Sequence, residues 1–176
     1  MKNIITILLF FFTVFTLRGQ DQKESTRSSN LPSVELKTLD GKTILTDTLS
    51  NHGKPLIISF WALWCKPCIK ELSNIANVYE EWVEETGVRL VAVSIDDPRS
   101  SSRVKPFVDG KSWEFDVLLD PNSDFKRAMN VNLIPHTFLL DGSGKVVWQH
   151  TSYTEGSEIE LIQMVRKLNQ GQTLQE

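Results

Sequence analysis

The stretch PLIISFWALWCKPC, residues 55–68, indicates the fold most directly and contains both cysteines of the chain. Residues 55–63 are apolar apart from Ser59, and such an uninterrupted run is typical of a strand that is buried on both faces. Cys65 and Cys68 follow directly, three positions apart, with one proline between them. The stretch therefore predicts a buried strand that delivers two thiols to a tight loop at its carboxyl end.

The residues after the cysteines carry a helical pattern. Apolar side chains recur every three to four positions, at Ile69, Leu72, Ile75 or Ala76, Tyr79 and Val83. Gly87 follows, and a glycine is common just past the end of a helix, so one helix is expected up to this residue. Residues 88–96 (VRLVAVSID) then indicate a second buried strand. Strand, helix and strand in this order predict a βαβ unit with a parallel pair.

The flanking segments complete an α/β pattern. Asp40-Gly41 lies between two short strand-like runs and predicts an N-terminal hairpin. A second antiparallel hairpin is expected from residues 136–141 and 145–151. The remaining expected elements are a short helix within 97–112, a short strand at 115–120, a helix over 123–129 with Asn122 or Ser123 as its cap, and an amphipathic helix over 158–168 with Ile159, Ile162, Val165 and Leu168 on its apolar face. The sum is a central sheet with parallel and antiparallel parts, covered by helices.

The N-terminus differs from the rest of the chain. Lys2 precedes an uncharged apolar stretch from residue 4 to residue 17, which is the layout of a secretory signal and is short for a membrane span. Residues 1–19 are therefore interpreted as a cleaved signal peptide or an N-terminal membrane anchor. Polar residues 20–30 follow as a linker. The globular domain is expected over residues 31–170, with a tail at 171–176.

Composition limits the possible functions. The chain has 176 residues, 40% of them hydrophobic, which suits one globular domain with an ordinary core. The net charge is -3 and no long basic block is present, so nucleic-acid binding is not expected. Export would place the protein outside the cytosol, where thiols tend to be oxidised. A dithiol there is either a structural bridge or a catalytic pair that a partner keeps in its working state.

The position of the cysteines favours redox chemistry. If the helix begins near Cys65, its free N–H groups and positive dipole end stabilise a thiolate, and Lys66 adds a positive charge. Pro67 fits the first turn, where no N–H is needed. Cys68 lies one turn further in and is shielded. The pair therefore predicts an exposed attacking thiol at Cys65 and a resolving thiol at Cys68.

Three other interpretations of the cysteine pair have less support. A structural disulfide across so short a loop restrains little of the unfolded chain and contributes little stability. A structural zinc site needs four ligands, and His52, His136 and His150 are scattered. Two buried free thiols do not suit an oxidising compartment. A Cys-x-x-Cys pair in a βαβ setting favours a redox role over these three.

The segment FWALWCKPC, residues 60–68, resembles the active-site strand and loop of thioredoxin. The wider pattern is similar to the exported TlpA/ResA-like branch of that superfamily, over residues 31–168. The segments that carry this similarity are LDGK (39–42), GKPLIISFWALWCKPCIKEL (53–72), VRLVAVSID (88–96) and NLIPHTFLLDGSGKVVW (132–148). The resemblance implies a thioredoxin-like fold with an N-terminal β-hairpin and a helical insert in the 97–112 region. It also implies a membrane-tethered or periplasmic thiol–disulfide oxidoreductase.

The resemblance transfers roles to single residues. Cys65 matches the nucleophile and Cys68 the resolving cysteine. Ile134-Pro135 matches the loop whose cis-proline faces the disulfide and whose backbone pairs with an extended substrate. Trp64, Lys66 and Pro67 are expected to support the same site.

The chain also departs from the family pattern. Ser59 stands where thioredoxin carries a buried acid. In the ResA-like branch, an acid after the VAVSI strand acts near the cysteines. Asp97 matches this acid best, and Asp96 is its neighbour. A location in a solvated turn, without a role at the site, is an equal alternative for both. Ser73 replaces a helix-kinking proline, so a straighter helix is expected. His136 either tunes the thiolate or faces water.

The resulting hypothesis is an exported reductant of disulfides in envelope proteins, with cytochrome c maturation as one such setting. Its only redox group would be the Cys65–Cys68 disulfide, with no metal or organic cofactor. Its partners would be disulfide-bearing envelope proteins and a membrane or periplasmic thiol carrier that recycles the pair. Two alternatives are a peroxidase-like relative, although a Pro-x-x-x-Thr-x-x-Cys motif is missing, and a copper chaperone that uses Cys65, Cys68 and His136.

Overall fold

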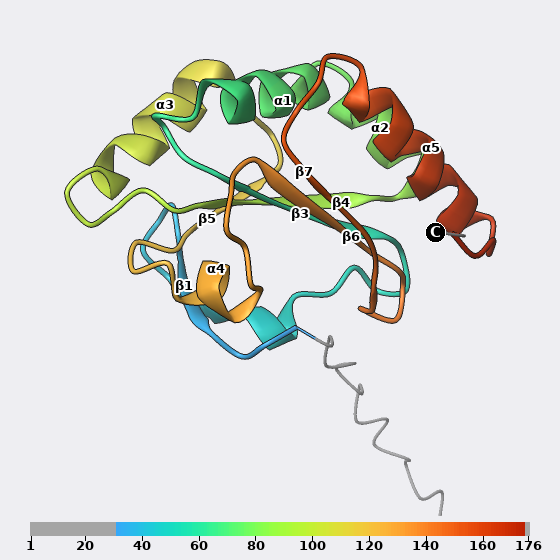
Figure 1. Ribbon diagram of the computed structural model, residues 1–176, viewed down its shortest axis with the longest axis horizontal. Helices are drawn as coiled ribbons and strands as arrows, with labels where there is room; N and C mark the ends of the chain where they lie inside the picture. The colour runs from blue at the N-terminus through green and yellow to red at the C-terminus, as the bar shows by residue number, and fades with distance from the viewer. Residues whose placement is uncertain (1–30, 175–176) are drawn as a thin grey trace, which may run out of the picture.

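The structure, a computed structural model, describes residues 31–174 (Figure 1). The predicted signal or anchor (1–19) and linker (20–30) lie outside the described residues. One seven-stranded sheet runs through the domain in the order β2-β1-β5-β4-β3-β6-β7. Strands β3, β4 and β5 are parallel to one another, whereas the β1–β2, β1–β5, β3–β6 and β6–β7 pairs are antiparallel. The strands are β1 (Glu35–Thr38), β2 (Thr43–Leu45), β3 (Leu56–Trp61), β4 (Arg89–Ser94), β5 (Asp116–Leu119), β6 (His136–Leu140) and β7 (Val146–Thr151).

The helices cover both faces of this sheet unequally. Helices α1, α2, α3 and α5 lie over one face, and α4 lies on the other, beside β1 (Figure 1). Their bounds are α1 (Lys66–Ala76), α2 (Tyr79–Thr86), α3 (Val104–Lys111), α4 (Asp124–Ala128) and α5 (Ser157–Asn169), with 3-10 turns η1 (Thr46–Thr48) and η2 (Ser101–Arg103). The mixed sheet, the N-terminal hairpin and the helical insert η2–α3 confirm the predicted fold class. No helix within residues 31–174 is long and apolar enough to cross a membrane.

Strand β3 lies between the two hydrophobic cores and contributes side chains to both. All six of its residues are buried, because a strand with helices on both sides has no face in contact with water. Trp61 points to the four-helix side, where its ring lies 5.0 Å from that of Trp113. Phe60 points to the opposite side and lies 5.4 Å from Phe125. The alternation of side chains along β3 thus anchors both layers.

The helix after the cysteines is not continuous, which corrects the expectation of one helix up to Gly87. Helix α1 ends at Ala76 and α2 begins at Tyr79, because the N–H of Val78 bonds to the carbonyl of Ile75 in a tighter turn (3.0 Å). The break changes which face of the second helix is buried. Trp82 is buried at 4% exposure, whereas the expected core residue Val83 is 39% exposed.

One expectation for α4 is confirmed and one for α5 needs correction. Ser123 is the N-cap residue of α4, as predicted, although its side chain makes no capping hydrogen bond; the buried carboxylate of Asp120 accepts from the N–H groups of Asp124 (2.7 Å) and Lys126 (2.8 Å). In α5, Ile162 and Val165 are buried as expected, but Ile159 is 59% exposed.

Candidate active site around the Cys65–Cys68 disulfide

The two cysteines form a disulfide at the start of α1. After β3 the chain turns sharply, and the N–H of Cys65 bonds to the carbonyl of Ala62 at 3.0 Å. Cys65 is the N-cap of α1, and its sulfur accepts from the N–H of Cys68 at 3.3 Å. The Cα atoms of the two cysteines are 5.3 Å apart. Cys65 is buried, with 5% of its surface exposed, which corrects the expectation of an exposed thiol; Cys68 is fully buried, so Cys65 is the more accessible of the two to a substrate.

The first turn of α1 favours an anion at Cys65. Lys66 and Pro67 occupy the first two helical positions and are exposed, and no acidic side chain lies in this turn. The free N–H groups and the dipole of the helix therefore act on the Cys65 sulfur without competition from a nearby carboxylate in this turn.

The loop before β6 brings a second part of the chain to the site. The Ile134–Pro135 peptide bond is cis, as the family resemblance implies. Pro135 is buried, and Ile134 is half-buried against the core cluster that contains both cysteines. Within residues 31–174 the backbone N–H and C=O of Ile134 take part in no hydrogen bond, so they are available to an extended chain.

A buried carboxylic acid lies one turn into α1. Glu71 follows Cys68 by three residues and therefore lies on the same side of the helix. Its Oε1 accepts from the Thr137 hydroxyl at 2.9 Å, and Thr137 lies 3.2 Å from the Ser59 hydroxyl. The acid that thioredoxin carries at the position of Ser59 is absent, and Thr137 links the Ser59 hydroxyl to a carboxyl from α1 instead.

Burial decides the protonation of this acid. Desolvation raises the pKa of Glu71 from 4.5 to about 7; the Thr137 hydrogen bond opposes this shift and the charge of Glu158 adds to it. The second carboxyl oxygen of Glu71 is buried without a hydrogen-bond partner among residues 31–174. Glu71 therefore titrates near neutral pH, and such a perturbed pKa is typical of groups at functional sites.

Glu71 is not among the site residues predicted from the sequence. A usable signal was present, because the helical pattern of buried positions runs from Cys68 through Leu72 to Ile75, and Glu71 lies beside them. An acid within an apolar face, three residues after the second cysteine, is a candidate for a functional group.

Asp96 and Asp97 have different surroundings. Asp96 is buried, and its Oδ2 accepts from the N–H of Leu63 and from the hydroxyl of Ser94, each at 2.9 Å, so it holds the loop that precedes the cysteines. Asp97 is exposed, and its Oδ1 accepts from two backbone N–H groups and from the Ser100 hydroxyl at 2.7 Å. These bonds, led by that of the Ser100 hydroxyl, lower the pKa of Asp97. The role of Asp97 as the acid of the site stays a prediction.

His136 is the first residue of β6, directly after the cis-proline, and its ring contacts side chains of β7. Its ring nitrogens lie 3.3 Å from the Gln149 amide oxygen and 2.9 Å from the Thr151 hydroxyl. Partial burial lowers its pKa, so the neutral form is favoured near neutral pH. Among the residues that the structure describes, no three His, Cys, Asp or Glu side chains are grouped as metal ligands, so the copper hypothesis has no preformed three-residue set.

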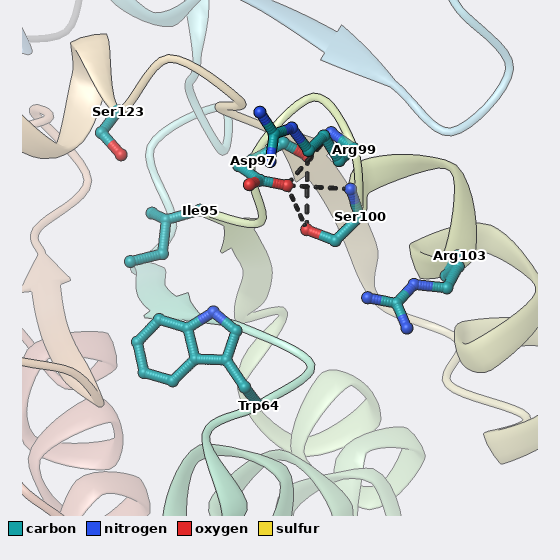
Figure 2. A pocket seen from close by; sticks show the side chains of 7 residues that line it. All are labelled: Trp64, Ile95, Asp97, Arg99, Ser100, Arg103 and Ser123. Carbon is teal, nitrogen blue, oxygen red and sulfur yellow. Dashed lines mark hydrogen bonds between the residues drawn. The ribbon is translucent and has the colours of Figure 1, made fainter.

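Exposed apolar side chains surround the disulfide. Trp64, directly before Cys65, is 67% exposed, and Leu133, before the cis-proline, is 68% exposed. Trp64 also lines a cleft of about 510 Å³ against the segment 95–103. Figure 2 shows its indole reaching toward the turn of Asp97 and Ser100. An exposed aromatic ring beside a reactive sulfur is suited to contact with a partner protein.

The fold and this site define a thioredoxin-like thiol–disulfide oxidoreductase. Comparison with known proteins agrees: the AhpC/TSA family matches residues 28–149 of this chain. The thiol-disulfide oxidoreductase ResA of Bacillus subtilis (strain 168) is 31% identical over 144 residues, which are 82% of this chain and 78% of the relative.

Solved structures agree on the fold. An uncharacterized thioredoxin-like protein from Porphyromonas gingivalis is 57% identical, with a TM-score of 0.73, over 81% of this chain and 94% of that chain. A thiol:disulfide interchange protein of the thioredoxin family from Chlorobium tepidum TLS is 24% identical, with a TM-score of 0.63, over 81% and 97% of the two chains, and supports the fold alone. This chain therefore belongs to the AhpC/TSA family, and its relatives include ResA.

Proposed function

We propose that the protein reduces disulfide bonds of exported proteins, with Cys65 as the attacking thiol and Cys68 as the resolving thiol. The observation that carries this proposal is the Cys65–Cys68 disulfide at the N-terminus of α1, in which Cys65 is 5% exposed and Cys68 is fully buried. In the reduced protein, the Cys65 thiolate attacks one sulfur of a substrate disulfide and releases the first substrate thiol. Cys68 loses its proton and attacks Cys65 in the resulting mixed disulfide, which releases the second thiol. Two electrons pass from the protein to the substrate.

Glu71 is the base that this second step needs. Cys68 is buried, and burial among apolar groups raises the pKa of a thiol, so it does not ionise readily by itself. Glu71 lies on the same side of α1 and has a pKa of about 7, so its carboxylate can accept the Cys68 proton. When the substrate disulfide has been reduced, the proton leaves through Glu71.

The same carboxyl supports action as a reductant. A stabilised thiolate makes the reduced protein a weaker reductant and raises its reduction potential, as in strongly oxidising members of this fold. A buried carboxylate near the thiols disfavours the thiolate and therefore opposes the effect of Lys66 and the helix dipole. Glu71 would thus shift the pair toward reducing potentials.

Substrate contact is assigned to the exposed edge of the site. The open backbone of Ile134 would pair with an extended segment of the substrate, and Trp64 and Leu133 would cover its side chains. Backbone pairing and apolar contacts of this kind suit substrates of many sequences. Residues 1–19 would export the chain to the periplasm or cell envelope, where apocytochromes c are one class of dithiol protein and a thiol carrier would recycle Cys65 and Cys68.

Single cysteine variants test the proposal. The reduced protein is mixed with a peptide disulfide, and the products are alkylated and weighed by mass spectrometry. Cys65→Ala is expected to release no peptide thiol, and Cys68→Ala to accumulate a stable mixed disulfide at Cys65. If Cys65→Ala retained the rate of the unaltered protein, the assignment of the nucleophile would be wrong.

A further inference from the structure

We propose that the cleft beside Cys65 selects disulfides in polypeptides that carry acidic side chains next to the reacting cysteine, through Arg99 and Arg103. This inference rests on the proposed disulfide exchange and adds a substrate class to it. The two arginines belong to the segment that follows β4 and leads into α3, and both line the cleft with Trp64 (Figure 2).

The cleft lies where the flanks of a bound substrate would be. Trp64 forms one wall, and the next residue in the chain is the attacking Cys65. An extended chain advances about 3.3 Å per residue, so the neighbours of a substrate cysteine bonded to Cys65 come within reach of the cleft. The exposed indole gives such a segment an apolar surface on which to lie.

The charges of the cleft are what distinguish it. Within residues 31–174, Arg89, Arg127 and Arg166 each hold a carboxylate within 4.0 Å. The two remaining arginines of this part of the chain, Arg99 and Arg103, have no carboxylate within that distance, and both lie in this cleft. Two unpaired guanidinium groups in one hollow form a site for carboxylates.

The single acid of the cleft, Asp97, offsets part of the charge of Arg99, which helps to lower the pKa of this acid, and two arginines against one carboxylate leave the cleft positive. The Oδ1 of Asp97 already accepts from the N–H groups of Arg99 and Ser100 and from the Ser100 hydroxyl. Lys66, exposed beside Cys65, is also without a carboxylate within 4.0 Å in the described part of the chain, and adds a third free positive charge near the sulfur. The whole chain carries a net charge of -3, so this positive patch differs in sign from the protein around it.

A selection experiment tests this patch. The full-length reduced protein is mixed with three disulfide-linked peptides that differ only in the two residues flanking the cysteine: Glu, Gln or Lys. The second-order rate constant for release of peptide thiol is measured at low salt. Because the protein is reduced beforehand and each molecule reacts once, no recycling partner is needed. We expect the Glu peptide to react about threefold to tenfold faster than the Gln peptide, with the Lys peptide slowest, as two exposed ion pairs allow.

Variants and salt assign the effect to the cleft. In Arg99→Ala/Arg103→Ala the ratio of Glu to Gln rate constants should fall to about one, and in Arg99→Glu/Arg103→Glu the order should reverse in favour of Lys. The matched control is Lys145→Glu, an exposed position in the β6–β7 turn at the opposite end of β6, which should keep the ratio of the unaltered protein. Salt near 1 M should abolish the preference, because it screens exposed charges.

Glutathione disulfide is included as a fourth substrate. Three outcomes would overturn the inference: equal rates for the Glu and Gln peptides, a preference that survives in the double alanine variant, or a preference for glutathione disulfide with none among the peptides. The last would assign the arginines to small carboxylates. Failure of the proposed function looks different, because the protein would then fail to reduce even the uncharged hydroxyethyl disulfide.

Discussion

The replacement Glu71→Gln tests whether a buried, titrating carboxyl lies beneath the active-site disulfide. Glutamine keeps the shape of the side chain and an acceptor for the Thr137 hydroxyl, but it cannot ionise. Burial raises the pKa of Glu71 from 4.5 to about 7, so the folded protein binds a proton at pH values where the unfolded chain has released it. Wild-type stability should therefore fall as the pH rises from about 4.5, and the loss should be complete above about pH 7.

The size of the effect follows from the two pKa values. Each pH unit between them corresponds to about 1.4 kcal/mol, so the interval from 4.5 to about 7 gives a loss of about 3 kcal/mol in the wild type. The variant lacks this loss. Its free energy of unfolding, relative to the wild type, should rise by about 3 kcal/mol between pH 4 and pH 8.

Urea unfolding of the oxidised proteins, followed by tryptophan fluorescence at several pH values, measures this difference. Any fixed cost of burying the glutamine amide cancels, because only the change with pH is used. Thr137→Val serves as the second variant: it removes a hydrogen bond that lowers the pKa of Glu71, so the pH-dependent loss should grow. A difference in the free energy of unfolding between Glu71→Gln and the wild type that stays constant from pH 4 to pH 8 would show that Glu71 does not titrate with a raised pKa.

Two further predictions concern the loop and a backbone contact. Asp96→Ala should lower the free energy of unfolding by about 2–3 kcal/mol, because it leaves the N–H of Leu63 without its acceptor. Asp97→Ala, at the surface, should lower this free energy clearly less. Urea unfolding of the two variants measures the difference. Gly142→Ala should lower the free energy of unfolding by about 3 kcal/mol or more, because its Cβ would lie 2.0 Å from the Gly53 carbonyl oxygen. Gly110→Ala, in α3 with open space around it, should raise this free energy by about 0.5–1 kcal/mol, and thermal unfolding distinguishes the two opposite effects.

Local signals were enough to predict most of the fold. The apolar run of β3 has no helical period, the Asp40-Gly41 pair favours a tight hairpin, and both features act over a few residues. The Cys-x-x-Cys motif is an equally local signal. The structure has Cys65 as the N-cap of α1 and Cys68 in its first turn, as expected for a helix that begins near Cys65.

The features that escaped prediction depend on contacts between distant residues. Glu71 acquires its raised pKa from burial and from Thr137, which is 66 residues further along the chain. The break after Ala76 has no glycine or proline to mark it, and it lets Trp82 enter the core in place of Val83. A propensity read along one helix cannot include such packing.

The reduction potential of the Cys65–Cys68 pair tests the central claim, that the protein is a disulfide reductant, most directly. The protein is equilibrated in redox buffers of defined dithiol-to-disulfide ratio, and the oxidised fraction is counted by alkylation and mass spectrometry. We expect a potential near that of thioredoxin, about -270 mV, or lower. A potential near about -120 mV, typical of a strong oxidant of this fold, would contradict it.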